Sequence, residues 1–328
     1  MSLDALSRDS WLRLTSETPL QSMLQPHSEP AALIANLSWW MIGTFTVVFL
    51  VVMLLAGVAL WRGMRARTSL SERASRNLVL LGGVVVPSFI LLALVIASIL
   101  VGQASSGEQG DADLTAEVIG HRWWWEIRYR DRDDNLLAVA ANELHLPAGE
   151  TVRLVLKASD VIHSFWAPNL DGKTDMIPGM TNERWLRIDR PGVYRGQCAE
   201  FCGDQHALMA VRIEVQAQSA FRDWLQRQGE PAVAAALAMD DARQIFRERG
   251  CADCHTIRGT RAGGQSGPDL THLASRQTLA AATLPNNRGH LGGWITDPQS
   301  NKPGVLMPAT RLQPAELRAL LDYLQALE

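Results

Sequence analysis

Cysteine is scarce in this chain, and several signatures of enzymes and of nucleic-acid-binding proteins are missing. Its 328 residues include four cysteines and carry a formal net charge of -3. So small a net charge gives no strong field for nucleic acid or for a charged membrane surface. The sequence also has no phosphate-binding glycine loop, activated nucleophile, general acid–base pair, internal repeat or long low-complexity tract. We therefore expect no nucleic-acid partner and no catalytic residue in this chain.

The N-terminus lacks the apolar core of a signal peptide, because the first 30 residues are interrupted by Asp4, Asp9, Glu17 and Glu29. Two long runs without charge follow, 39–61 and 78–101. At about 1.5 Å per residue, each is long enough to cross a hydrocarbon core of about 30 Å. We expect two transmembrane helices there, with a kink at Pro87, and a short interfacial helix near Ala35 before the first span.

The segment that connects the two runs is strongly basic. Residues 62–77 contain five arginines but only Glu72 as an acid. The positive-inside rule places such a loop in the cytoplasm, so both ends of the chain lie outside. Trp39, Trp40 and Trp61 stand at the edges of the first run, where an aromatic belt is expected.

After a polar linker, 102–110, the hydrophobic period changes to two. Strand-like segments at 114–120, 123–129, 151–157, 183–189 and 208–215 alternate with turn signals. Several short strands in about 100 residues indicate an antiparallel Greek-key sandwich. Within it, Trp123, Trp124 and Trp125 are consecutive, so alternation along a strand would leave at least one of them exposed.

Two thiols, an imidazole and a thioether fall within twelve residues, at Cys198, Cys202, His206 and Met209. Soft sulfur donors with imidazole select copper or zinc rather than calcium or magnesium. His163 follows a strand-like run and could complete the set. From spacing alone, a Cys198–Cys202 disulfide and a structural zinc site remain open alternatives.

A second cluster, Cys251-Ala-Asp-Cys254-His255, has the spacing at which haem c is attached through two thioethers. His255 would then be the proximal iron ligand. A redox-active dithiol is the alternative. Helical patterns are expected at 217–227, 241–249 and 314–327, so this part of the chain reads as all-α.

Longer stretches resemble known families. Asp160 to Pro168, Lys173 to Gly179 and the cysteine loop resemble the copper domain of cytochrome c oxidase subunit II. The resemblance implies two coppers bridged by Cys198 and Cys202. It further implies His163 and His206 as ligands, and Met209 and the Glu200 carbonyl as weak outer ligands. The Glu200 side chain would face a magnesium ion shared with subunit I.

The C-terminal part of the chain resembles a second family. Gly267-Pro-Asp-Leu270 and Val305-Leu-Met307-Pro308 resemble class I cytochromes c, which implies Met307 as the distal haem ligand. With two cysteines on copper and two on haem, none is left for a disulfide.

In the resemblance to subunit II, Trp123 matches the indole through which electrons reach the copper site. His121 is expected to be structural, and His27, His145, His272 and His290 to bind no metal.

We thus expect a membrane-anchored multidomain protein with a two-helix transmembrane hairpin, an all-β cupredoxin Greek-key domain and an all-α cytochrome c domain. The expected boundaries are a periplasmic segment 1–38, a hairpin 39–101 with cytoplasmic loop 62–77, a copper A domain 111–216, a linker 217–239 and a cytochrome c domain 240–328.

The resemblance implies an electron-transfer subunit of a bacterial inner-membrane oxidase. Electrons would pass from haem c to copper A and on to haem in subunit I, where oxygen is reduced with proton pumping. Subunit I, subunit III, membrane lipid and a cytochrome c or cytochrome bc donor would be the partners. A nitric oxide reductase subunit or a membrane-tethered electron or copper carrier remains the alternative.

The chain departs from the family in two places. Many relatives carry a glutamate seven residues before the proline of the second span, and here that residue is Leu80. A role for this subunit in proton uptake on that side is therefore in doubt. The segment 126–134 also has mixed charges, whereas relatives that recruit a basic soluble cytochrome c present an acidic face, so steering by charge should be weak here.

Overall fold

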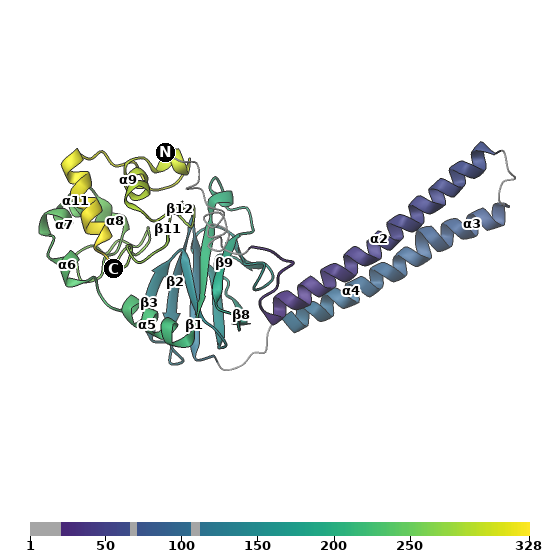
Figure 1. Ribbon diagram of the computed structural model, residues 1–328, viewed down its shortest axis with the longest axis horizontal. Coiled ribbons are helices and arrows are strands. Elements are labelled where there is room, and N and C mark those ends of the chain that lie inside the picture. Colours follow the sequence, from purple (N-terminus) through teal and green to yellow (C-terminus); the bar gives the residue numbers. More distant parts are fainter. Residues whose placement is uncertain (1–20, 66–70, 106–111) are drawn as a thin grey trace, which may run out of the picture.

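The computed structural model describes residues 21–65, 71–105 and 112–328. Figure 1 shows a long helical hairpin, a β-sandwich beside its near end, and a C-terminal helical domain on the far side of the sandwich. The expected three-part architecture is confirmed. Parts of the expected N-terminal segment, basic loop and polar linker, at 1–20, 66–70 and 106–111, lie outside the described residues.

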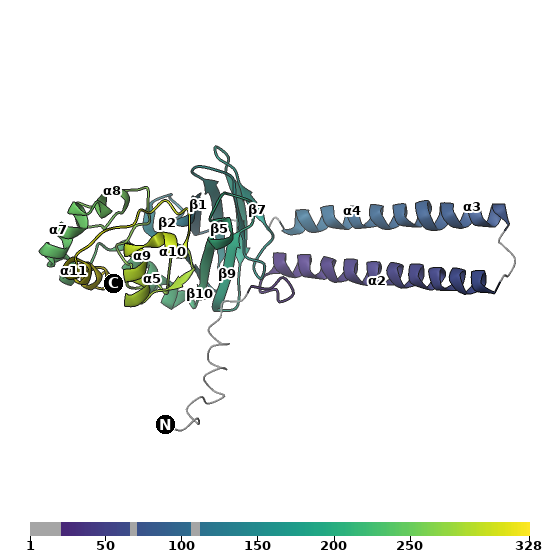
Figure 2. The same cartoon turned by 90° about the horizontal axis from the view of Figure 1, so that it is seen from above.

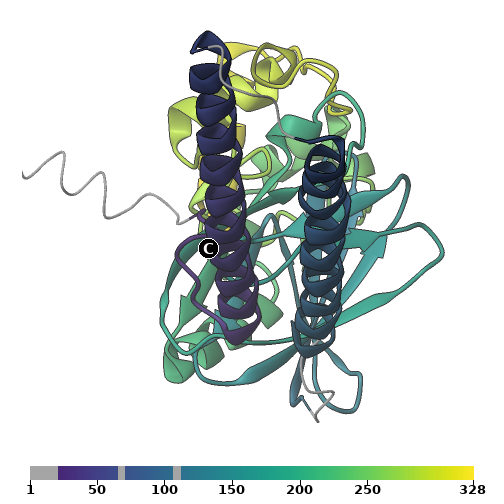
Figure 3. The same ribbon diagram turned by 90° about the vertical axis from the view of Figure 1, so that its right-hand side faces the viewer.

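The hairpin consists of α2, Glu29–Met64, and a second rod formed by α3, Glu72–Leu80, a π-helical turn, Leu81–Val85, and α4, Val86–Ser105. Ser28 caps α2 by accepting a hydrogen bond from the Ala31 amide, and Ser71 caps α3 in the same way. Figures 2 and 3 show the two rods side by side. The first helix begins at Glu29 and continues without a break, so the expectation of a separate interfacial helix near Ala35 was wrong.

Both rods are long and apolar enough to cross a membrane. The most apolar stretch of each has no buried residue, which is the reverse of a helix from the core of a soluble protein. The expected spans 39–61 and 78–101 fall inside these helices.

The irregularity in the second rod occurs just before Pro87. In the π turn the Val86 amide donates to the Leu81 carbonyl, one residue further back than in an α-helix. Proline has no amide hydrogen, and its ring clashes with the carbonyl four residues earlier. A wider turn before the proline accommodates that clash, so the local distortion follows from the residue expected to cause it.

Two five-stranded sheets make the β-sandwich. Their orders are β3-β2-β1-β5-β8 and β4-β10-β9-β6-β7. The strands are β1 Leu114–His121, β2 Trp124–Arg130, β3 Leu136–Ala141, β4 Glu143–Pro147, β5 Thr151–Ala158, β6 His163–Trp166, β7 Thr174–Met176, β8 Asn182–Arg187, β9 Gly192–Cys198 and β10 Ala210–Gln216.

The sheets are mixed, not antiparallel throughout as expected. β1 pairs in parallel with β5, and β10 pairs in parallel with β4. The period-two segments correctly located one strand each, but a residue pattern carries no information on which strand lies beside which. Parallel neighbours need a long connection, so they join segments distant in sequence.

The core of the sandwich is rich in aromatic side chains. Trp123, Trp124 and Trp125 are all buried, so the expectation that one would be exposed was wrong. Trp125 packs edge-on against Phe165 inside the sandwich. Trp124 lies on the other face, where the His121 ring stacks on it at 4.3 Å and covers it. The tryptophan side chains therefore do alternate between the two faces of the strand, but both faces are covered by other residues.

The helices that follow the sandwich are α5 Gln218–Gly229, α6 Ala234–Leu237, α7 Asp240–Glu248, α8 Cys251–Cys254, α9 Arg288–Thr296, α10 Pro298–Asn301 and α11 Pro314–Gln325, with one small hairpin, β11 Thr278–Leu279 and β12 Leu284–Pro285. α5 belongs to the sandwich, because its Phe221 is part of that core. α7 and α11 pack together through Phe246 and Tyr323 in a separate core.

Candidate metal centres

The first candidate centre lies at one end of the sandwich, where β6 begins and β9 ends. His163 opens β6 and Cys198 closes β9. The chain then turns through Cys202 and a short 3-10 turn, His206–Leu208, before β10. Antiparallel pairing of β6 with β9 joins Phe165 to Cys198, which brings the histidine to the cysteine loop across 35 residues of sequence.

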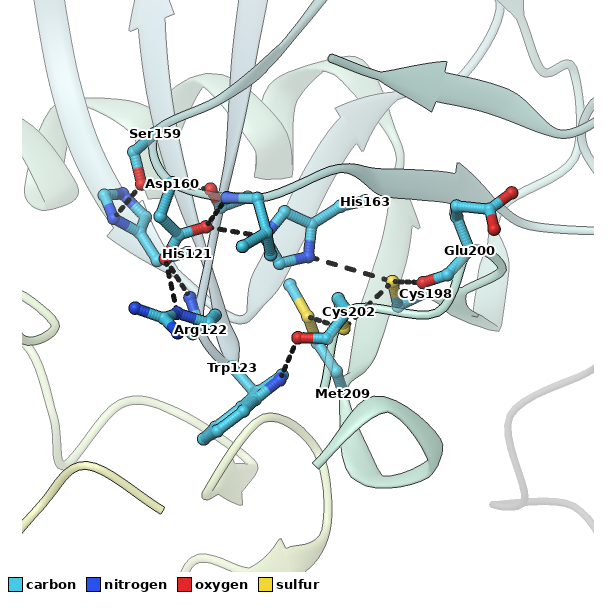
Figure 4. Close-up of polar contacts among 12 residues, drawn as sticks. His121, Arg122, Trp123, Ser159, Asp160, His163, Cys198, Glu200, Cys202 and Met209 are labelled. Atoms are coloured by element: carbon cyan, nitrogen blue, oxygen red, sulfur yellow. Dashed lines mark hydrogen bonds and ion pairs between the residues drawn. The ribbon is translucent and has the colours of Figure 1, made fainter. Parts of the chain in front are cut away.

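The sulfur and nitrogen atoms of this loop form a continuous cluster. The two cysteine Sγ atoms are 3.7 Å apart, and both cysteines are free thiols. His163 Nδ1 lies 3.8 Å from Cys198 Sγ, and His206 Nδ1 lies 3.7 Å from Cys202 Sγ. Figure 4 shows the cysteine sulfurs and Met209 together, with the His163 ring on one side and the Trp123 indole on the other. Each thiol thus has its own imidazole.

Two weaker donors complete the cluster, one for each thiol. Met209 Sδ is 3.9 Å from Cys202 Sγ, and the Glu200 carbonyl oxygen is 3.2 Å from Cys198 Sγ. Both cysteines, His163 and Met209 are buried. This donor set fits two soft metal ions that share two thiolates, since each ion would find one imidazole and one weak outer ligand.

Protonation in the metal-free cluster is asymmetric. The hydrogen bond from Cys202 lowers the pKa of the Cys198 thiol, and the same contact raises the pKa of Cys202. Burial would lower the pKa of His163, but its contacts with Cys198 and Asp160 outweigh that effect and raise it. The lowered pKa of Cys198 favours its thiolate, which is the form that ligates a metal.

His163 is oriented by residues that pattern reasoning did not single out. Its Nε2 lies 2.9 Å from the Asp160 carboxylate, which leaves Nδ1 to face the sulfur. A carboxylate partner of this kind fixes the orientation of a ligating imidazole. On the other side, the ring packs on Gly120, where a Cβ atom would come within 2.9 Å of it.

Trp123 is in direct contact with the cysteine loop. Its Nε1 donates to the Cys202 carbonyl at 2.8 Å. Its ring also lies against Gly203, which has φ of +111° and where a Cβ would come within 2.9 Å of the indole. Only glycine adopts that conformation readily, so this position allows both the turn and the close approach of the ring. The expected route through Trp123 stays a prediction.

The Glu200 side chain points away from the sulfurs. With Lys173 and Asp175 it forms an exposed cluster, in which Lys173 Nζ lies 3.2 Å from Glu200 and 2.9 Å from Asp175. Glu200 is the residue whose side chain was expected to face subunit I, and Lys173 and Asp175 lie beside it on the same surface.

The second candidate centre is in the C-terminal domain. Cys251 and Cys254 lie one helical turn apart on α8, and His255 follows directly. His255 Nδ1 lies 2.8 Å from the Pro268 carbonyl, which leaves Nε2 available, and a Cβ at Gly267 would come within 2.7 Å of the ring. Burial lowers the pKa of His255, which favours the neutral imidazole that ligates iron.

The remaining candidate residues have contacts of their own. Met307 lies half-buried in the loop between α10 and α11, and its carbonyl accepts a hydrogen bond from Gln299. Its role as distal ligand stays a prediction. His121 contacts Glu126 and Ser159, which suits a structural role. Likewise, His272 is held between two backbone carbonyls, those of Glu230 and Glu328.

Comparison with known proteins agrees with this division. Residues 133–216 match the family model for the periplasmic domain of cytochrome c oxidase subunit II, and residues 239–328 match the cytochrome c model. The chain is 38% identical to cytochrome c oxidase subunit 2 of Alkalihalophilus pseudofirmus over 223 residues, which cover 67% of this chain and 63% of that protein. It is 31% identical to the Bacillus sp. strain PS3 protein of the same name over 265 residues, or 74% and 72% of the two chains.

Solved structures with similarity include the periplasmic domain of subunit II of the Bradyrhizobium japonicum oxidase. That structure is 32% identical, with a TM-score of 0.33, over 36% of this chain and 95% of that one. A chain of a heme-copper terminal oxidase dimer is 24% identical, with a TM-score of 0.31, over 44% and 100%. From the family models and the sequence relatives, this chain belongs to the cytochrome c oxidase subunit 2 family, in a form with a C-terminal cytochrome c domain.

Proposed function

We propose that this chain takes electrons onto a haem c held by Cys251, Cys254 and His255 and passes them to a binuclear copper A centre. From there they would reach haem in subunit I of a bacterial heme-copper oxidase, where oxygen is reduced with proton pumping. The chain itself would be the electron-transfer subunit. Its two domains would lie on the periplasmic side of the inner membrane, anchored by α2 and α4.

One observation carries this proposal: two thiols 3.7 Å apart, each with its own imidazole nitrogen within 3.8 Å. A structural zinc site needs one set of four ligands around one ion. Here the two thiols lie between two imidazoles and two weak donors, Met209 and the Glu200 carbonyl. Bound copper would supply one-electron redox chemistry at such a site.

The protein's own groups orient the ligands and exclude water. Asp160 and Gly120 hold the His163 ring, and Pro268 and Gly267 hold the His255 ring. Trp123 covers the cysteine loop and is 6% exposed. We propose it as the side chain through which electrons enter the copper site. Because this indole is so buried, it suits an electron donor in the same chain better than a soluble donor protein.

The proposed partners follow from the family resemblance. The cluster of Lys173, Asp175 and Glu200 would face subunit I, with Glu200 supplying a ligand to a shared magnesium ion. Subunit III is expected in the same complex. A cytochrome c or the cytochrome bc complex would supply electrons to the haem.

Metal analysis of the full chain tests the proposal. We expect two coppers and one covalent haem per chain. Cys198→Ser should abolish the copper pair and its absorption while the haem band stays, because the two sites share no ligand. One zinc and no copper in the wild-type chain would overturn it. Oxygen or nitric oxide consumption by the purified complex identifies the terminal acceptor.

A further inference from the structure

The loop that contains Met307 meets the copper-ligand loop, and a buried lysine lies between them. Lys302 follows α10, five residues before Met307, and is 1% exposed. Its Nζ donates to the Leu208 carbonyl at 3.0 Å and to the Ala280 carbonyl at 3.2 Å. Leu208 directly precedes Met209. One side chain thus connects the proposed distal haem-ligand loop to the copper-ligand loop.

A lysine this deeply buried normally has an acidic partner. Among the ion pairs of the described residues, Lys302 has none, and its hydrogen bonds go to the two carbonyl oxygens. The Cys202 sulfur is near enough to favour the charged amine, but it offsets only part of the effect of burial. The position therefore has a cost in desolvation that contacts between loops must offset. A lysine kept there without a carboxylate indicates a role in joining these segments.

Other contacts bring the same segments together. The Ala210 amide donates to the Ala281 carbonyl at 3.2 Å, and Thr283 Oγ1 donates to the Leu208 carbonyl at 3.3 Å. Gln205 donates to the Pro303 carbonyl. The copper-ligand loop is thus hydrogen-bonded to the C-terminal domain on both sides of Met209.

The turn that receives these bonds is strained. Ala280, Ala281 and Ala282 all have φ between +53° and +56°, a left-handed conformation that alanine rarely adopts. Such residues persist only where their surroundings hold them. Here the turn is closed by the pairing of β11 with β12 and by the Thr283 amide, which donates to the Leu279 carbonyl. Lys302 and the Ala210 amide add hydrogen bonds to the Ala280 and Ala281 carbonyls, and the bond from Ala210 joins this turn to the copper-ligand loop.

We propose that Lys302 is a positioning residue that keeps the haem domain docked on the copper-ligand loop, so that electron transfer between the two centres occurs in one fixed geometry. This inference rests on the proposed function. The step moves one electron: ferrous haem c is oxidised to ferric and the oxidised copper pair is reduced by one electron. No bond is made or broken, and no proton moves at Lys302.

The test compares Lys302→Met with Lys157→Met in the full chain loaded with copper and haem. Lys157 forms an ion pair with Glu117 inside the copper domain, so its loss removes a lysine contact without touching the interface. After pulsed photoreduction of the haem, we expect transfer to copper in Lys302→Met to be at least about tenfold slower, since loss of these bonds shifts the docked population. Lys157→Met should transfer at the wild-type rate, and Lys302→Arg should restore part of the loss.

A second readout separates positioning from general destabilisation. In Lys302→Met the docked state is less populated, so the two domains must come together again before each transfer. The transfer rate of this variant should therefore depend on solvent viscosity, whereas the wild-type rate should not depend on it. Haem and copper spectra should stay unchanged. A wild-type rate in Lys302→Met, or a slower rate that stays independent of viscosity, would overturn the proposal.

Hydrogen exchange decides the case in which Lys302→Met fails to load copper. The Ala210 amide should lose protection in Lys302→Met and keep it in Lys157→Met, both compared in the metal-free state. Unchanged protection of Ala210 in Lys302→Met would overturn the proposal. Failure of the proposed function would look different, since the wild-type chain itself would then lack the copper pair.

Discussion

Gly120→Ala should weaken copper binding without touching a ligand. Gly120 is the second-last residue of β1, and the His163 ring lies directly on it. A Cβ there would stand 2.9 Å from two ring carbons, whereas ordinary contact begins at 3.4 Å. The ring must therefore move by about 0.5 Å, the difference between the two distances. His163 is completely buried, so the ring has no free space to move into.

The expected size follows from two effects. Overpacking a filled site costs about 1–3 kcal/mol of folding free energy. Displacing the ring also changes the distances from His163 Nδ1 to the sulfurs and from Nε2 to Asp160. Loss of such support for a ligating histidine lowers metal affinity by about 10–100-fold. We expect a copper affinity lower by that factor and an altered copper absorption band.

Chelator competition on the full chain measures the affinity, and the haem band reports whether the C-terminal domain is intact. Gly263→Ala is the matched control, because a Cβ there meets nothing within 4 Å and the residue has no positive φ. Wild-type copper affinity and spectrum in Gly120→Ala would refute the reasoning, since they would mean that the His163 ring is not fixed by this packing.

Three other outcomes are expected. Met307→Ala should remove the near-infrared charge-transfer band of methionine-ligated ferric haem, and survival of that band would place the distal ligand elsewhere. Burial lowers the pKa of His145 from 6.5 to about 4. The unfolded chain therefore binds a proton that the folded chain does not, and stability should fall by about 3 kcal/mol as pH drops from 6.5 to 4, as measured by urea unfolding. His145→Phe should flatten that dependence, and an equally steep loss in the variant would contradict the assignment. A reporter fused after Val101 should be active only if it functions in the periplasm.

Local patterns predicted the parts of this molecule that depend on local sequence. Uncharged runs located both apolar helices, and period-two alternation located β1, β2, β5, β8 and β10. β3 was missed because Leu136–Ala141 is apolar throughout, so no alternation marks it. β9 was missed because Gly192 and Gly196 interrupt the strand pattern. Neither strand has a period-two signature, but the causes differ: β3 has no polar residue to alternate with its apolar ones, and glycines interrupt β9.

The residues of the candidate copper site could be predicted only in part from the sequence. The spacing of Cys198, Cys202 and His206 indicated a metal, and His163 was a candidate from its place after a strand-like run. Its role as a ligand came from the resemblance, because strand pairing brings it to the loop from a distant segment. Asp160 and Gly120 have no chemical signature of their own. An aspartate three residues before a histidine and a glycine in a strand are ordinary until the fold places them against the ring.

The contacts between the two domains could not be read from the sequence at all. Glu143 illustrates why. In β4 it looks like a surface carboxylate, yet it is 3% exposed and accepts hydrogen bonds from the Gln277 and Thr278 amides and from Thr278 Oγ1. Burial raises its pKa, and those donors from the C-terminal domain oppose the rise. Docking supplies these donors to the buried carboxylate, and they offset the water that it loses. Glu143 and Lys302 therefore fasten the same interface at two separate points, one on β4 and one on the copper-ligand loop, and two such points limit rotation to the axis that joins them, where one would leave it free in every direction.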